Sequence, residues 1–86
     1  MAREKASINV KILNKDGSVY NGKCQVLFVP YKKEEIAILP LHTPIIALLS
    51  NGKIRIKDDS GTRTVMKITS GIIYVGEDEV SVLVDV

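Results

Sequence analysis

Hydrophobic and polar residues alternate along much of this chain with a period of two. The clearest segments are 7–13, 53–57 and 79–86, and the last places Val80, Val82, Val84 and Val86 on one face. Because successive side chains of a strand point to opposite faces, this alternation predicts strands with one face in a core. Residues 24–29 are almost continuously apolar and predict an inner strand. No window of ten or more residues repeats at 3.6, so we expect no helix beyond one turn that residues 31–35 could form.

Turn signals separate these segments at short intervals. Asn51-Gly52 predicts a type I′ hairpin, because both residues tolerate positive φ, and residues 58–61 predict a second hairpin tip. Short strands between regular turns are typical of an all-β fold. We therefore predict a two-sheet β-sandwich or flattened barrel of about eight to ten short, mostly antiparallel strands. Residues 7–86 are expected to form this single domain, and residues 1–6 an N-terminal tail.

The composition agrees with this fold class and excludes several others. The chain has 86 residues, among them eleven Ile and ten Val, which suit a half-buried pleated surface. This length supports one small core and leaves little room for a deep active-site cleft. The longest apolar run is far shorter than the roughly 20 residues of a membrane-spanning helix. The charged N-terminus is not followed by the apolar stretch of a secretory signal, so we expect no membrane insertion and a cytoplasmic location.

Charge is distributed unevenly along the chain. The net charge is only +2, which does not indicate nucleic acid by itself. Residues 1–57 hold ten basic and four acidic residues, whereas residues 58–86 hold two basic and six acidic ones. This asymmetry is either ordinary surface variation in a small chain or the mark of a polarised domain that meets a partner with one end.

The chain offers little for catalysis. Nucleophilic catalysis would have to use Cys24 with His42, the single cysteine and the single histidine, but a cysteine in an apolar run is usually a small buried hydrophobe. One cysteine excludes an intramolecular disulfide and a cysteine-based zinc site. Neighbouring carboxylates such as Glu34 and Glu35 would point to opposite faces of a strand. We expect a protein that is not an enzyme and has no cofactor and no metal site.

A stand-alone module that binds single-stranded nucleic acid or carbohydrate is the alternative interpretation. Such a module needs a basic groove with exposed stacking aromatics. The candidates are Tyr20, Phe28, Tyr31 and Tyr74 with Lys32, Lys33, Lys53, Arg55 and Lys57. These aromatics are scattered and Phe28 is expected to be buried, so our main expectation includes no nucleic-acid partner.

Two prolines, Pro40 and Pro44, enclose the segment Leu41-His42-Thr43. Proline fixes its own φ and keeps the preceding residue extended, so this loop should be stiff. It is either a sandwich corner whose imidazole bonds a nearby carbonyl, or a rigid contact loop in which Leu41 is a core anchor or an interface residue.

Several motifs occur in one order along residues 7–86. The segment Ala37-Ile38-Leu39-Pro40-Leu41-His42-Thr43-Pro44-Ile45 is followed by Gly52, then Ser70-Gly71-Ile72, and finally Val80-Ser81-Val82-Leu83-Val84-Asp85. In these motifs the chain resembles the N-terminal β-sandwich domain of the epsilon subunit of rotary ATP synthases. It departs from the family where glycines are replaced, at Glu34, Ala37, Leu41 and Ser70.

The resemblance implies a mechanical role. It implies a non-catalytic rotor subunit of the central stalk, which couples rotation of the membrane rotor ring to the gamma subunit and the catalytic head during ATP synthesis. The implied location is a peripheral complex on the cytoplasmic face of the inner or plasma membrane. The implied contacts with gamma and the ring (c) subunits are Tyr31, Lys32, Lys33, Glu35, Leu41, His42 and Thr43. Longer family members continue into a two-helix hairpin, whereas this sequence ends at Val86, so it is either a naturally short member or the sandwich domain of a longer chain. We expect that this form neither binds ATP nor inhibits hydrolysis through such an arm.

Overall fold

The computed structural model of the chain describes residues 6–40, 43–77 and 79–85, and within these ranges it is built from strands without helices. The nine strands are β1 (Ile8–Asn14), β2 (Gly17–Cys24), β3 (Val26–Tyr31), β4 (Glu34–Ile38), β5 (Ile45–Leu49), β6 (Gly52–Asp58), β7 (Gly61–Ile68), β8 (Gly71–Val75) and β9 (Glu79–Val84). The predicted all-β class and strand number are confirmed.

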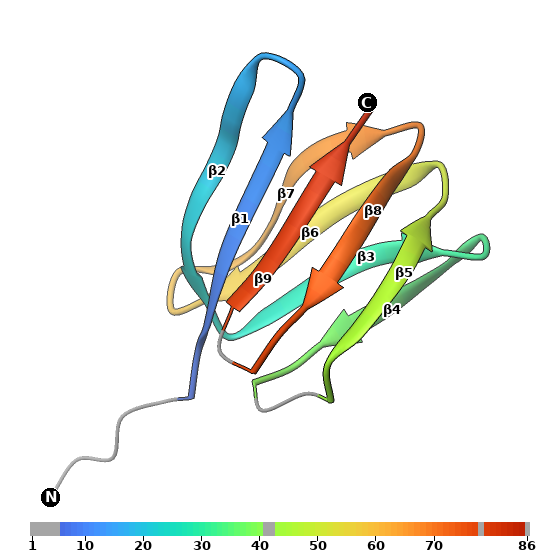
Figure 1. Cartoon of the computed structure of the whole chain (residues 1–86). Helices are drawn as coiled ribbons and strands as arrows, with labels where there is room; N and C mark the ends of the chain where they lie inside the picture. The colour runs from blue at the N-terminus through green and yellow to red at the C-terminus, as the bar shows by residue number, and fades with distance from the viewer. Residues whose placement is uncertain (1–5, 41–42, 78, 86) are drawn as a thin grey trace, which may run out of the picture.

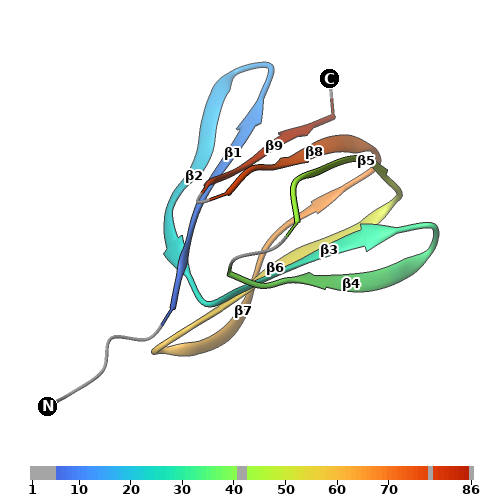
Figure 2. The ribbon, with the colours of Figure 1, turned by 60° about the horizontal axis from the view of Figure 1, so that its bottom comes forward.

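The strands form two sheets that lie face to face (Figures 1 and 2). The first sheet has the order β2-β1-β9-β8-β5, and the second has the order β4-β3-β6-β7. All neighbours are antiparallel except β1 and β9, which pair in parallel. The arrangement is a β-sandwich and not a closed barrel. Strand β3 lies between β4 and β6, so the inner strand predicted at 24–29 occurs at Val26–Tyr31, whereas Cys24 ends the edge strand β2.

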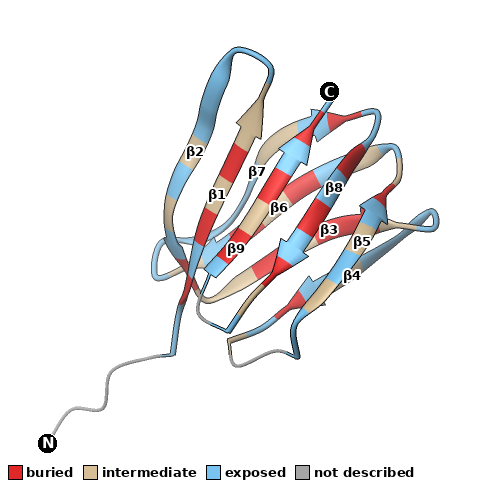
Figure 3. Cartoon of the chain, viewed as in Figure 1, coloured by how far each residue is buried: buried red, intermediate tan, exposed pale blue. Residues whose placement is uncertain are grey.

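The core lies between the sheets and follows the alternation of the sequence. Buried and exposed residues alternate along β8 and β9, as Figure 3 shows. Both sheets supply branched aliphatic side chains to this core, and those with an exposed fraction of 1% or less are Val10, Ile12, Leu27, Val29, Ile38, Ile54, Ile56, Ile73, Val75, Val80, Val82 and Val84. Burial of this apolar surface is the main favourable term in folding. The predicted core faces of residues 7–13 and 53–57 are therefore confirmed, as is that of residues 79–86 up to Val84. Val86 and residues 1–5 of the predicted tail lie outside the described residues.

The predicted hairpin at Asn51-Gly52 is wrong. Strand β5 belongs to the first sheet and β6 to the second, so this turn carries the chain across the sandwich. The Ser50 amide donates a hydrogen bond to the Pro30 carbonyl at 3.0 Å. A Cβ on Gly52 would lie 2.6 Å from the Cβ of Pro30. Glycine is therefore needed here for close approach to another strand, and not for a positive φ.

A two-residue hairpin with positive φ occurs instead at Lys32 and Lys33, where φ is 51° and 67°. Tyr31 pairs with Glu34 across this turn, so β3 and β4 form a tight hairpin and residues 31–35 do not form a helical turn. Positive φ at both central residues is the geometry of a type I′ turn, which twists with the strands. The Lys33 amide donates to the Ser50 hydroxyl at 3.2 Å, which ties the turn to the β5–β6 connection.

The second predicted hairpin tip is confirmed. Asp58 pairs with Gly61 across the turn between β6 and β7. Gly61 has a φ of 112°, which L-residues with a side chain rarely adopt. The Asp58 carboxylate accepts hydrogen bonds from the Arg63 guanidinium and from the Ser60 amide, and these contacts, that of Arg63 first, lower the pKa of Asp58.

Asp85 closes the connection between β7 and β8. Its carboxylate accepts hydrogen bonds from the Thr69 amide at 2.8 Å, the Thr69 hydroxyl at 2.9 Å and the Ser70 amide at 3.2 Å. Its own amide donates to the Ser70 carbonyl. These donors favour the charged form and lower the pKa of Asp85. The aspartate of the closing motif thus has a structural role in this chain.

A candidate protein-docking face

The outer face of the first sheet carries a row of apolar side chains that crosses four strands. Leu13 on β1 pairs with Leu83 on β9, Leu83 pairs with Ile72 on β8, and Ile72 pairs with Leu48 on β5. The next row contains Ser81, Tyr74 and Ile46. Residues that pair directly share one face of a sheet, so these side chains lie side by side. We call Ile46, Leu48, Ile72, Tyr74 and Leu83 the apolar face.

The apolar face is open to solvent. Leu48 is 72% exposed, Ile46 70% and Tyr74 53%. Single exposed hydrophobic residues are normal, but a contiguous apolar patch on a folded domain usually marks an interaction site. Aromatic residues such as Tyr74 are also enriched in the buried centre of protein interfaces. The arrangement is suited to binding another protein surface.

The edge strand of the sheet next to this face, β5, contains no charged residue. The four edge strands of the sandwich are β2, β4, β5 and β7. Three of them contain charged residues, such as Lys23 on β2, Glu35 on β4 and Lys67 on β7, whereas β5 consists of Ile, Ala and Leu alone. Proteins usually protect exposed edges with charges or bulges because a bare edge pairs with other chains. The composition of β5 therefore leaves this side suited to a partner surface.

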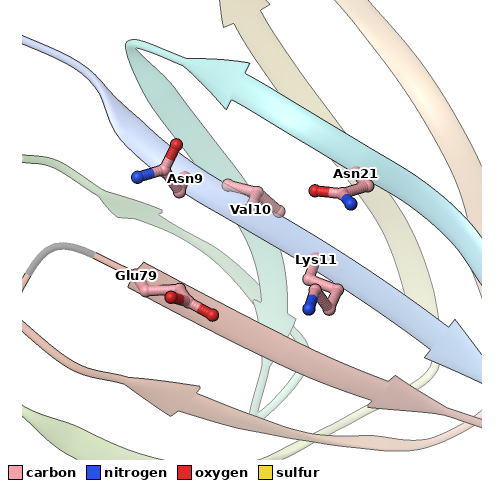
Figure 4. A pocket seen from close by; sticks show the side chains of 5 residues that line it. All are labelled: Asn9, Val10, Lys11, Asn21 and Glu79. Carbon is pink, nitrogen blue, oxygen red and sulfur yellow. The ribbon is translucent and has the colours of Figure 1, made fainter.

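A polar hollow borders the apolar face. It has a cavity volume of about 210 Å³ and is lined by Asn9, Val10, Lys11, Asn21 and Glu79 from β1, β2 and β9 (Figure 4). Lys11 pairs with Ser81, which in turn pairs with Tyr74, so the hollow continues the second row of the apolar face. Polar groups around an apolar centre are the usual organisation of a protein interface.

The residues expected to contact partners fall in two places. Tyr31, Lys32, Lys33 and Glu35 lie together in the β3–β4 hairpin, where Glu35 forms an ion pair with Arg55 at 3.1 Å. Thr43 is exposed and lies beyond the far end of β4, just before β5, so it is not brought to the hairpin tip. Leu41 and His42 lie outside the described residues.

Cys24 is buried at the end of β2 and is 2% exposed. Burial, followed by the negative charge of Asp58, raises the pKa of the Cys24 thiol to about 11. A thiol is a nucleophile only as the thiolate, so this environment suits a core residue and not a catalytic one.

We therefore expect Cys24 to resist alkylation in the folded protein. At pH 8 a pKa of about 11 leaves roughly one thiol in a thousand ionised. Labelling by iodoacetamide, followed by mass spectrometry, should be at least about 100-fold slower in buffer than in urea. Comparable rates in the two conditions would contradict the buried position.

The aromatic side chains do not form one stacking surface. Phe28 is half-buried and not fully buried as predicted, because it faces outward from β3 with the Arg55 guanidinium 5.3 Å from its ring centre. Tyr20 packs against the core from β2. Tyr74 lies on the outer face of the first sheet, whereas Tyr31 ends a strand of the second. Single-strand binding needs neighbouring exposed rings, and these four are separated.

Among the described residues, no group of three or more His, Cys, Asp or Glu side chains is arranged to hold a metal ion. Within the same ranges there is also no helix with the length and hydropathy needed to cross a bilayer.

Comparison with known proteins identifies the family. The family model for the beta-sandwich domain of the ATP synthase delta/epsilon chain matches residues 7–86. The chain belongs to this family. The match covers every described strand, so the predicted resemblance to the epsilon sandwich domain is confirmed.

Curated relatives with the same family name are similar over most of this chain. The ATP synthase epsilon chain of Ruthia magnifica is 31% identical over 80 residues, and that of Alkalilimnicola ehrlichii is 29% identical over 80 residues. In both comparisons the aligned region covers 93% of this chain and 57% of the relative. The chain thus spans little more than half the length of these relatives.

Solved structures show the same fold. A chain in the mitochondrial ATP synthase of Euglena gracilis, in a structure containing OSCP, F1 and the c-ring, matches 96% of this chain with a TM-score of 0.77 and 16% identity. A chain in the central stalk and c-ring structure from Tetrahymena thermophila matches 98% with a TM-score of 0.67 and 11% identity. This chain covers 53% and 66% of those two chains.

The apolar face was not predicted from the sequence. Residues 45–49 and 71–75 contain apolar residues on both faces of a predicted strand, and this pattern is the sequence signal for the apolar face. A strand that is apolar on both faces either lies in the middle of a protein or exposes one apolar face to a partner. The structure decides between these possibilities, because β5 and β8 lie in a sheet of a two-layer sandwich and one face of that sheet is open to solvent.

Proposed function

We propose that this chain is a non-catalytic rotor subunit of a rotary ATP synthase, in the position of epsilon. The observation that carries the proposal is the exposed apolar face on a sandwich of the delta/epsilon family. In this role the domain couples rotation of the membrane rotor ring to the gamma subunit and the catalytic head. A closely packed sandwich suits the task, because protein interiors have low compressibility and transmit strain.

The two partners would use different parts of the domain. The apolar face, with Leu48 and Ile46 at its exposed edge, would pack on the gamma subunit, since a long-lived contact favours apolar burial. The charged β3–β4 hairpin with Lys32, Lys33 and Glu35 would meet the polar loops of the c subunits. Tyr31, Leu41, His42 and Thr43 would complete these contacts, by resemblance to the family. Contacts through the hairpin should weaken as salt is raised.

The proposed location follows from these partners. The chain would be held at the cytoplasmic face of the inner or plasma membrane, as part of a peripheral complex on the rotor ring. It would contact the ring subunits and not insert into the bilayer.

Coupling of hydrolysis to ion transport tests this function. Membranes from cells that lack the chain should hydrolyse ATP without ATP-driven ion pumping, and ATP synthesis should fall to background. Adding back the full chain should restore both. Normal pumping and synthesis in its absence would overturn the proposal.

A further inference from the structure

The outer face of the second sheet is cationic, in contrast to the apolar face of the first. Lys53, Arg55 and Lys57 alternate along β6 with the buried Ile54 and Ile56, so the three basic side chains point outward together. Lys67 on β7 joins them. We call Lys53, Arg55, Lys57 and Lys67 the cationic face. The two sheets are stacked (Figure 2), and the two named faces are the outer faces of different sheets, so they point away from each other.

The charge on the cationic face is largely uncompensated by the described residues. Arg55 is paired with Glu35 at 3.1 Å, which leaves three lysines for which no described carboxylate forms an ion pair. Lys53 and Lys67 are directly paired across β6 and β7. Like charges at directly opposite positions of a sheet destabilise it. The repulsion between these two ammonium groups would be relieved by an acidic group of a partner that lies between them.

We propose that the cationic face is a docking surface for an extended acidic segment of a partner polypeptide. Basic side chains at every second position of β6 are about 6.6 Å apart, since a strand rises about 3.3 Å per residue. Carboxylates at every second position of an extended segment have the same spacing. Such a segment lying along β6 would meet Lys53, Arg55 and Lys57 in turn, with Lys67 beside it.

Other anionic ligands fit this surface less well. Single-stranded nucleic acid needs exposed rings for stacking, and the aromatic ring of this face, Phe28, is covered by Arg55 at 5.3 Å. A membrane surface is bound best by cations combined with exposed apolar side chains. The large exposed hydrophobic residues of the described strands lie on β2, β5, β8 and β9, all in the first sheet.

Binding of a labelled peptide of alternating Glu and Thr to the full chain tests this proposal. Fluorescence anisotropy should show binding at low ionic strength that weakens as salt is added. Lys67→Glu and Lys53→Glu should each raise the Kd by roughly tenfold. The matched control is Lys23→Glu, which makes the same charge change on exposed β2 of the other sheet and should leave the Kd within about twofold.

A stability measurement separates lost binding from lost folding. Lys67→Glu places a carboxylate opposite Lys53, so the isolated chain should melt at or above the temperature of the unaltered protein. Lys67→Gln removes the charge alone and should weaken peptide binding as well. The proposal is overturned if the peptide does not bind at low ionic strength, or if Lys23→Glu weakens binding as much as Lys67→Glu. It is also overturned if oligothymidylate or phosphatidylserine vesicles bind more tightly than the peptide.

Discussion

Leu48→Asp is expected to weaken binding of the chain to a catalytic head that carries gamma by roughly 30-fold or more, equivalent to about 2 kcal/mol. Leu48 lies on the edge strand β5 and is 72% exposed, so the change places a charge within the proposed contact. A carboxylate buried against an apolar partner loses its hydration without gaining a counter-charge. Isothermal titration calorimetry measures the affinity.

Val19→Asp is the matched control for this experiment. Val19 is also an exposed branched aliphatic residue on an edge strand of the first sheet, but it lies on β2, away from the apolar face. Its replacement should leave the affinity within about threefold, and both variants should keep the melting temperature close to that of the unaltered chain. Equal losses for the two variants would show that the apolar face does not bind gamma.

Ile73→Ala is expected to lower the free energy of unfolding by about 2–5 kcal/mol. Ile73 is 0% exposed and lies in the core on β8, so truncation leaves a cavity as well as removing buried apolar surface. For a domain of this size such a loss lowers the melting temperature by more than about 10 °C. Urea unfolding followed by circular dichroism measures the change.

Ile72→Ala makes the same chemical change one residue earlier, on the opposite face of the same strand. Ile72 is 38% exposed, so its truncation should change the free energy of unfolding by less than about 1 kcal/mol. It should instead weaken binding to gamma, because Ile72 lies between Leu48 and Leu83 on the apolar face. If Ile72→Ala destabilises the fold as strongly as Ile73→Ala, the assignment of the two faces is wrong.

Local patterns predicted the strands and the core of this protein, but not how the strands pair. Alternation of apolar residues located β1, β6 and β9 because only one face of each contributes to the core. The Asn51-Gly52 turn was misassigned because local turn preference carries no information about which sheet receives the next strand. Glycine is required at position 52 because Pro30, which is distant in sequence, lies too close for a Cβ atom there. The Lys32-Lys33 turn was missed because lysine is not a typical residue for positive φ.

The candidate site was predictable only in part. The resemblance located Glu35 and the hairpin residues beside it, and these four do lie together. The resemblance grouped Thr43 with these residues. In the structure β4 lies between them, so the hairpin residues are at one end of this strand and Thr43 lies beyond the other end. The apolar face required the complete strand order, since Leu83, Ile72 and Leu48 are far apart in sequence and meet only through pairing of β9, β8 and β5.

Co-purification from its own cells tests the rotor assignment most directly. The full chain, carrying an affinity tag, is expressed at its native level, captured in mild detergent, and the bound proteins are identified by mass spectrometry. We expect the gamma, c and catalytic subunits of the ATP synthase to be recovered with the chain, and to be lost from the Leu48→Asp variant. Recovery of the tagged chain without any of these subunits would contradict the account.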